Sequence, residues 1–150
     1  MIEISGVAHV VLAVNRFEVC VPFYESILSF MGMKCVQKGK ASLYYIGGNT
    51  AVAIGPTDSQ YRNEKFIQTR IGLHHLCFRS RSREDIDKMY EHLKSIAARI
   101  VHPPEEGPWC PGYYSVLFED PDGIRLELSY VPGKGLLAEG VKFDPSTHYE

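Results

Sequence analysis

The sequence predicts an α+β fold built from two copies of one strand–helix–strand–strand–strand module. The segment Gly6–Leu12 reads again as Gly72–Phe78, with His9 of the first copy falling on His75 of the second. A helical stretch and three short strands follow each copy. Similarity repeated at a fixed offset indicates a duplicated structural unit. The repeat is therefore the observation that decides the fold class.

The two modules are expected to form a single domain. They cover about residues 4–60 and 70–131, joined by a short linker, and neither alone would easily close a hydrophobic core. We therefore predict one domain over residues 1–131. Residues 132–150 form a polar tail that contains glycine and proline and has no clear periodicity.

The first module begins with a strand over residues 6–14. A helix is expected over Val21–Met31, where apolar residues recur at helical spacing. Proline fits only the first turn of a helix, so Pro22 places the start close to Cys20 or Val21. Three short strands follow, over residues 34–38, 41–46 and 50–54, with turns rich in glycine between them.

The second module repeats this order with clearer signals. Ser82, with Asp85 three residues later, is typical of a helix N-terminus because the hydroxyl can accept a free backbone N–H. Apolar residues then follow helical spacing as far as Ala97. A strand over residues 99–102 is expected to stop at the two prolines that follow it. The last two strands are expected over residues 113–119 and 124–131, joined by an Asp-Pro-Asp-Gly turn.

Composition excludes several classes of protein. A net charge of −2 over 150 residues gives no electrostatic case for binding nucleic acid or an anionic membrane. No apolar run approaches the roughly 20 residues that span a bilayer, and the first residues lack the pattern of a secretory signal. The four cysteines are widely spaced, so reduced thiols are expected. We expect a cytoplasmic protein with a small-molecule substrate.

The residues most suited to chemistry are His9, His75 and Glu127. Glu127 lies in the last strand, where it shares a face with Arg125 and Ser129 while the neighbouring leucines point the other way. Two imidazoles and one carboxylate can bind a divalent metal and leave coordination positions open. We therefore predict that these three side chains bind one metal ion.

Each of these residues also has a purely structural interpretation. A histidine in an apolar strand is often a packed core residue, and a glutamate between leucines is often the solvent-facing residue of an edge strand. Two histidines at the same place in two repeats favour the metal site. A buried carboxylate without a partner costs on the order of several kcal/mol, and a cation would remove that cost.

Three further side chains are candidates for a catalytic role. Arg125 could bind an anionic substrate group or orient Glu127. Tyr113 and Tyr114 follow a glycine-rich loop and could donate to a metal-bound oxyanion, although packing is an equal alternative. His74, next to His75 in a strand, is expected to point to the opposite face.

These motifs resemble the vicinal oxygen chelate superfamily, which includes glyoxalase I, methylmalonyl-CoA epimerase, extradiol dioxygenases, fosfomycin-resistance enzymes and bleomycin-resistance proteins. The resemblance rests on the two histidine segments, on Phe23-Tyr24 and above all on Phe118–Leu128. It implies paired βαβββ modules in a cupped mixed sheet, a homodimer, and a divalent metal that chelates two neighbouring substrate oxygens. His9, His75 and Glu127 fall on the ligand positions of the family.

This chain departs from the family pattern at one position, and the departure limits the reactions that the resemblance implies. The glyoxalase and epimerase branches usually take a fourth ligand from the last strand of the first module, where this chain has Val52 or Ala53. The remaining triad is similar to the three-ligand dioxygenases and thiol transferases. The sequence thus indicates an enzyme dependent on Fe²⁺, Mn²⁺, Ni²⁺ or Zn²⁺ with dioxygenase, lyase or transferase activity. The alternative is a drug-sequestering protein of the bleomycin-resistance type, a branch that generally lacks the triad.

Overall fold

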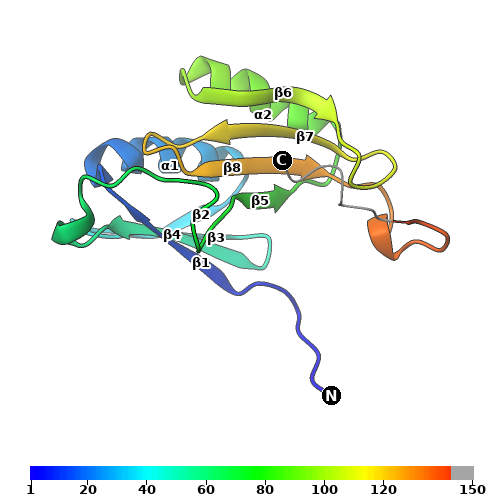
Figure 1. Ribbon diagram of the computed structural model, residues 1–150, viewed down its shortest axis with the longest axis horizontal. Coiled ribbons are helices and arrows are strands. Elements are labelled where there is room, and N and C mark those ends of the chain that lie inside the picture. Colours follow the sequence, from blue (N-terminus) through cyan, green and yellow to red (C-terminus); the bar gives the residue numbers. More distant parts are fainter. Residues whose placement is uncertain (143–150) are drawn as a thin grey trace. The chain divides into compact units, whose positions relative to one another are not determined.

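The computed structural model describes residues 1–142 and confirms the α+β class and the two βαβββ modules (Figure 1). The chain divides into two compact units, which are described one at a time. Unit 1 contains residues 1–66 and 120–123, and unit 2 contains residues 67–119 and those from 124 onward. The predicted single domain over residues 1–131 stays a prediction, and residues 143–150 of the predicted tail lie outside the described residues.

Unit 1 is a four-stranded mixed sheet with one helix. Its elements are β1 (His9–Val14), α1 (Phe17–Phe30), β2 (Lys34–Lys38), β3 (Leu43–Gly47), β4 (Thr50–Pro56) and a 3₁₀ turn at Ser59–Tyr61. The strand order is β1-β4-β3-β2, with β1 parallel to β4 and the other pairs antiparallel. The helix packs against β2 and β4. Buried positions alternate along β1 and β3, as one apolar face requires, whereas the inner strand β4 buries four consecutive residues. The buried residues include Leu12, Val14, Leu43, Val52 and Ile54.

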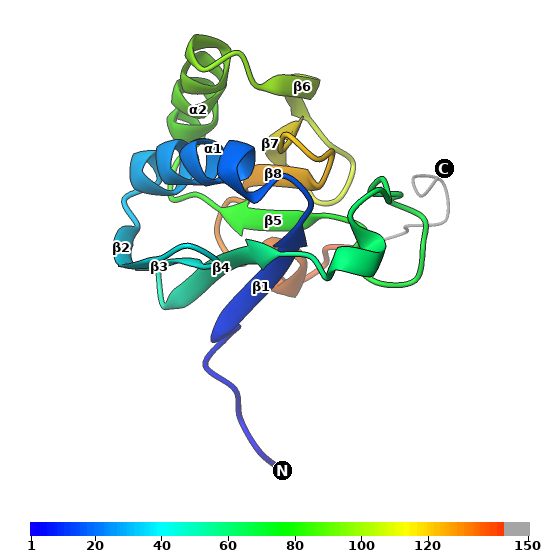
Figure 2. The ribbon, with the colours of Figure 1, turned by 90° about the vertical axis from the view of Figure 1, so that its left-hand side faces the viewer.

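Unit 2 repeats this arrangement. Its elements are β5 (Leu76–Arg79), α2 (Glu84–Ser95), β6 (Arg99–Glu106), β7 (Tyr114–Glu119), β8 (Arg125–Tyr130) and a 3₁₀ turn at Gly135–Leu137. The order is β5-β8-β7-β6, and β5 is parallel to β8. The helix α2 packs against β6, β7 and β8 (Figure 2). It buries Ile86, Met89 and Leu93 completely.

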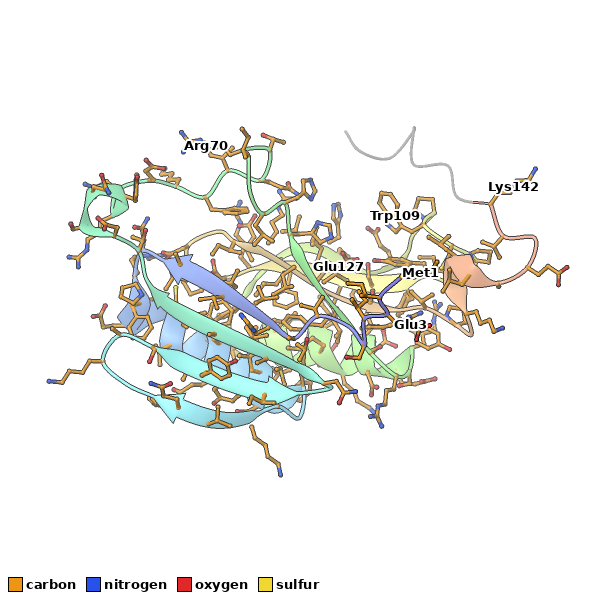
Figure 3. All side chains as sticks on the ribbon, turned by 90° about the horizontal axis from the view of Figure 1, so that it is seen from below. Met1, Glu3, Arg70, Trp109, Glu127 and Lys142 are labelled. Carbon is orange, nitrogen blue, oxygen red and sulfur yellow. The ribbon has the colours of Figure 1, made fainter. Side chains whose placement is uncertain are left out.

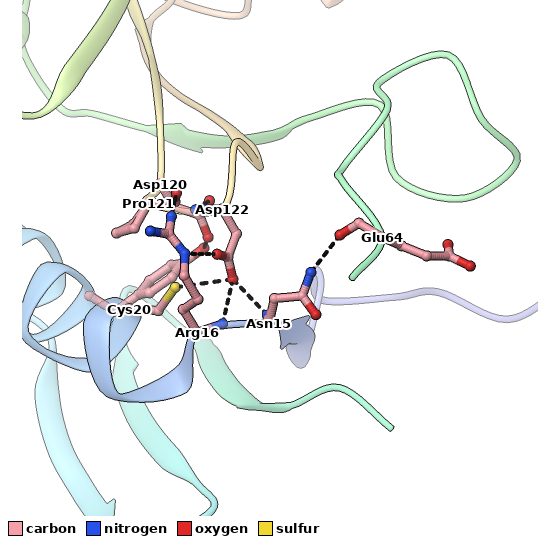
Figure 4. A network of polar contacts seen from close by, with 8 residues as sticks. Asn15, Arg16, Cys20, Glu64, Asp120, Pro121 and Asp122 are labelled. Atoms are coloured by element: carbon pink, nitrogen blue, oxygen red, sulfur yellow. Dashed lines mark hydrogen bonds and ion pairs between the residues drawn. The ribbon is translucent and has the colours of Figure 1, made fainter. Parts of the chain in front are cut away.

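The start of α1 was predicted four residues too late. The helix begins at Phe17 because Asp122, from the Asp-Pro-Asp-Gly turn, caps it (Figure 4). The Oδ2 atom of Asp122 accepts hydrogen bonds from the backbone N–H of Asn15 at 2.6 Å and of Arg16 at 3.0 Å. This carboxylate satisfies donors that a helix start leaves free. Pro22 consequently lies inside the helix, beyond its first turn, where its missing N–H removes one helical hydrogen bond.

Two strand boundaries also differ from the prediction. The strand β6 does not stop before Pro103-Pro104 but continues through both residues to Glu106. Prolines are tolerated there because β6 is an edge strand and its pairing with β7 shifts between His102 and Glu105. The strand β5 begins only at Leu76.

The start of α2 confirms the expected capping residue. The backbone N–H of Asp85 donates to Oγ of Ser82 at 3.3 Å. Within residues 1–142, neither α1 nor α2 nor any shorter helix has the length and apolar content that crossing a membrane requires.

Candidate functional site

The sheet of unit 2 has one face that carries polar side chains. Register places Cys77, Glu127 and Leu117 side by side across β5, β8 and β7, and it places Arg79, Ser129 and Ser115 side by side two residues further along. Side chains paired in this way share a face. We call it the polar face, defined by Cys77, Arg79, Ser115, Arg125, Glu127 and Ser129. The residues between them are apolar and include Val116, Phe118, Leu126 and Leu128.

Glu127 is buried within this face. It lies on β8, an inner strand, and is only 8% exposed; Figure 3 labels its side chain. The structural alternative, a solvent-facing glutamate on an edge strand, is therefore wrong. Burial of a carboxylate at such a position requires partners that stabilise its charge.

Three side chains provide that stabilisation. The hydroxyl of Tyr113 donates to Oε1 of Glu127 at 2.5 Å, while Nε2 of His75 lies 3.3 Å from Oε2. Burial by itself would raise the pKa of Glu127, but hydrogen bonding to His75, Tyr113 and Ser115 outweighs it and lowers the pKa. Burial and the bond to Glu127 raise the pKa of Tyr113. The pair is thus a carboxylate held by a neutral phenol.

His75 is oriented by a second histidine. Its Nδ1 lies 2.7 Å from Nδ1 of His74, which in turn lies 3.2 Å from the side-chain nitrogen of Gln68. The prediction that His74 points away from His75 is therefore wrong. Strand alternation does not apply to these two residues because β5 begins only at Leu76. Burial first, and then His75 and Arg125, lower the pKa of His74, which favours its neutral form.

The contacts of His75 allow two arrangements of its protons. The Nδ1 atoms of His74 and His75 lie within hydrogen-bond distance, and which of them donates depends on the tautomers. In one arrangement Nε2 of His75 donates to the Glu127 carboxylate, 3.3 Å away; in the other its lone pair faces that carboxylate, and a cation can bind between them.

The donor pair fits a divalent metal ion. Two ligand atoms about 2.1 Å from an ion, at an angle of about 90–110°, lie about 3.0–3.4 Å apart. The 3.3 Å separation of His75 Nε2 and Glu127 Oε2 falls in this range. An imidazole whose other nitrogen donates a hydrogen bond is also the usual form of a metal-binding histidine.

His9 belongs to unit 1, where it is the first residue of β1 and is exposed. It is thus not a packed core histidine. In residues 1–142, no three His, Cys, Asp or Glu side chains gather into a group that could hold a metal ion. The predicted set of His9, His75 and Glu127 draws on both units and stays a prediction.

The register of the two sheets also settles which residue of unit 1 matches Glu127. Val10 pairs with Val52 in β1 and β4, and Leu76 pairs with Leu126 in β5 and β8. Because Val10 corresponds to Leu76 in the repeat, Ala53 corresponds to Glu127. Ala53 has no ligand atom, so unit 1 offers nothing equivalent to that carboxylate.

The other two predicted catalytic residues have different partners. The hydroxyl of Tyr114 donates to Asp87 of α2 at 2.8 Å, and the Arg83 guanidinium lies 3.7 Å from the centre of its ring. Tyr114 therefore does not contact Glu127 as Tyr113 does, and its catalytic role stays a prediction. Arg125 lies on the polar face, but its Nε is 3.5 Å from the buried Glu119, which also binds Arg99 at 3.0 Å.

Two polar residues near Glu127, Ser115 and Cys77, were not predicted as its neighbours from the sequence. Ser115 is among the hydrogen-bonding partners that lower the pKa of Glu127. The thiol of Cys77 lies 3.2 Å from Oγ of Ser129. Desolvation and the Glu127 charge raise the pKa of Cys77 to about 12, so it is a thiol at neutral pH. Alternation places Ser129 beside Glu127, but only the strand register adds Ser115 and Cys77.

Comparison with known proteins gives consistent matches over most of the chain. The model of the Glyoxalase/Bleomycin resistance protein/Dioxygenase superfamily matches residues 6–128. The "uncharacterized protein YqjT" of Bacillus subtilis (strain 168) is 29% identical over 124 residues, which are 80% of this chain and 94% of that protein. The crystal structure of a "putative glyoxalase" from Bacillus halodurans is 28% identical, with a TM-score of 0.75 over 84% of this chain and 96% of that one. A glyoxylase/bleomycin resistance protein/dioxygenase domain from Frankia sp. EAN1pec is 27% identical, with a TM-score of 0.66 over 85% and 98%.

Proposed function

Because the chain belongs to the glyoxalase/bleomycin resistance protein/dioxygenase superfamily, we propose that it is a divalent-metal-dependent enzyme acting on a small molecule with two adjacent oxygens. His75 and Glu127 bind the ion, and His9 stays the predicted third ligand. The reaction is a dioxygenation, a lyase reaction or a group transfer. The proposal depends above all on the 3.3 Å separation of His75 Nε2 and Glu127 Oε2, which matches the distance between two ligand atoms of one ion.

Each residue of unit 2 has a defined task in this proposal. The Tyr113 hydroxyl fixes Oε1 of Glu127, which leaves Oε2 directed at His75. His74 lies 2.7 Å from Nδ1 of His75 and orients its ring so that Nε2 faces Glu127. A bound divalent ion supplies Lewis-acid polarisation of two neighbouring substrate oxygens. These residues hold the ligand atoms in place before the ion binds, which reduces the free energy spent on ordering them.

A drug-sequestering role without turnover explains less of the site. A protein that only encloses a drug has no need for a buried, ionised carboxylate beside an imidazole, since such a group is costly without a cation. The sequestering alternative is therefore kept as an outcome of the test below.

The test is the metal content of protein purified without chelator. Elemental analysis is expected to give close to one divalent ion per chain, and His75→Ala and Glu127→Ala are expected to lose most of it. His92→Ala is a matched control, because His92 lies on α2 and outside the polar face. Retention of metal by both ligand variants would contradict the assignment.

His9→Ala tests the third ligand separately. Loss of metal in this variant supports a set that includes unit 1, whereas full retention would limit the site to unit 2. Oxygen uptake with catechol then tests for turnover. Metal-free protein that binds an aromatic drug without consuming it would favour sequestration.

A further inference from the structure

The polar face carries two arginines, of which one has an ion-pair partner and the other has none among residues 1–142. Arg125 is paired with Glu119, which also binds Arg99. The side chain of Arg79 is exposed and has no hydrogen-bond or ion-pair partner among residues 1–142. The sequence indicated Arg125 as the residue for an anionic substrate group, and in the structure Arg125 shares the carboxylate of Glu119 with Arg99. Arg79 is thus the arginine of the polar face that has no carboxylate partner.

Arg79 lies close to the proposed metal ligands. It is two residues from Cys77 on β5, and Cys77 pairs with Glu127 on β8. Two residues along a strand correspond to roughly 7 Å, a distance that a long arginine side chain can partly cover. Arg79 and Glu127 thus lie on one face of one sheet, on neighbouring strands.

Two serines lie in register with Arg79 on the neighbouring strands. Its register partner on β8 is Ser129, which pairs in turn with Ser115 on β7. Ser129 is 5% exposed and Ser115 is also partly buried. Hydroxyl groups can donate to an anion that a guanidinium binds.

The position of the guanidinium is limited on one side by the segment after β8. A side chain at Gly135 would place its Cβ 2.6 Å from Val131 and 3.6 Å from Nη2 of Arg79. Gly135 has φ +55°, a conformation that favours glycine, so this turn packs closely on Val131 beside Arg79. One nitrogen of the exposed Arg79 guanidinium therefore lies beside Gly135, in the segment that follows β8.

From this placement we propose that Arg79 binds a carboxylate group of the substrate, at the end of the molecule away from the two metal-binding oxygens. The inference rests on the proposed function, because it takes the metal site at His75 and Glu127 as the other anchor. A single unpaired guanidinium matches one monoanionic carboxylate through two parallel hydrogen bonds. The substrate class is accordingly a small carboxylic acid that also carries two adjacent oxygens.

Two probes that differ only by a carboxylate test this proposal. Catechol and 3,4-dihydroxybenzoate both offer two adjacent oxygens, and only the second has the extra anion. Their dissociation constants are measured by calorimetry without oxygen, on Mn²⁺-loaded wild type, Arg79→Gln and Arg81→Gln. The last variant removes the same charge from the residue two positions later, after the end of β5.

Arg79→Gln is expected to bind 3,4-dihydroxybenzoate about tenfold more weakly while its affinity for catechol changes less than about twofold. Arg81→Gln is expected to behave like wild type with both probes. Equal losses for the two probes, equal losses in the two variants, or no binding of the charged probe by metal-loaded wild type would overturn the role of Arg79. A wild-type protein that retains no Mn²⁺ would instead overturn the proposed function on which this inference rests.

Discussion

Tyr113, immediately before β7, donates a hydrogen bond of 2.5 Å to Oε1 of Glu127 on the neighbouring strand β8. The same carboxylate approaches His75 through its other oxygen. The phenol therefore fixes the rotation of the carboxylate, and with it the position of the second oxygen. Side chains that orient a ligand in this way contribute to metal affinity without touching the ion.

Tyr113→Phe is expected to weaken Mn²⁺ binding about tenfold, because outer partners of metal ligands typically contribute at least this much. The loss should be larger at pH 5 than at pH 8. Removal of the hydrogen bond raises the pKa of Glu127 and lets protons compete with the ion. Calorimetric titration at both pH values measures the effect.

Tyr114→Phe is the matched control, since this neighbouring hydroxyl binds Asp87 on α2. It should bind Mn²⁺ like wild type. A similar loss in both variants would show that the Tyr113 effect is general damage to β7.

Asp122→Ala is expected to lower the free energy of unfolding by about 2 kcal/mol, the upper end of the range for a helix cap. Two backbone N–H groups at the start of α1 would lose their acceptor. Urea denaturation measures the change. Asp58→Ala removes a comparable cap from the one-turn 3₁₀ helix at Ser59–Tyr61 and should cost less than about 0.5 kcal/mol. Equal losses would argue against Asp122 as the residue that starts α1.

The contribution of Asp122 to stability should depend on pH. Burial pushes the pKa of Asp122 upward, but hydrogen bonds from Arg16, Cys20 and Asn15 outweigh it and lower the pKa. The ionised Asp122 carboxylate therefore stabilises the folded protein fully at pH values above its pKa in the unfolded chain, which is about 3.9. This stabilisation is lost as the pH falls through the lower pKa of Asp122 in the folded protein. The stability difference between wild type and Asp122→Asn should therefore be constant from pH 5 to 7 and shrink below pH 4. A stability difference that grows as the pH falls would contradict a lowered pKa for Asp122.

Ala53→Glu is expected to increase metal affinity by supplying the carboxylate that unit 1 lacks at the position matching Glu127. The buried carboxylate should also make the metal-free protein less stable, so added Mn²⁺ should raise its melting temperature more than it raises that of wild type. Val52→Glu is the control, because Val52 is 1% exposed and its side chain points to the opposite face. It should unfold the protein without improving metal binding. No gain in affinity at Ala53 would contradict the equivalence of the two positions.

The features that the sequence predicted correctly depend on local patterns. Helical spacing located α2, and alternation placed Glu127 on one face with Arg125 and Ser129. The βαβββ order follows from such periods because each element buries one face. The repeated histidine segment indicated that the two modules have the same structure.

The features that it missed depend on residues far apart in the chain. The cap of α1 comes from Asp122, more than a hundred residues after Arg16, and no local pattern contains that information. The contact between His74 and His75 was missed because alternation was extended beyond the start of β5. The partners of Glu127 on β7 required the strand register. The homodimer and the cytoplasmic location stay predictions.

The central claim is most directly tested by a crystal structure of the protein soaked in Mn²⁺, with data collected for anomalous scattering. The account predicts an anomalous peak about 2.1 Å from both Nε2 of His75 and Oε2 of Glu127. A map in which these two atoms are joined by a hydrogen bond, with the manganese absent or bound elsewhere, would contradict it.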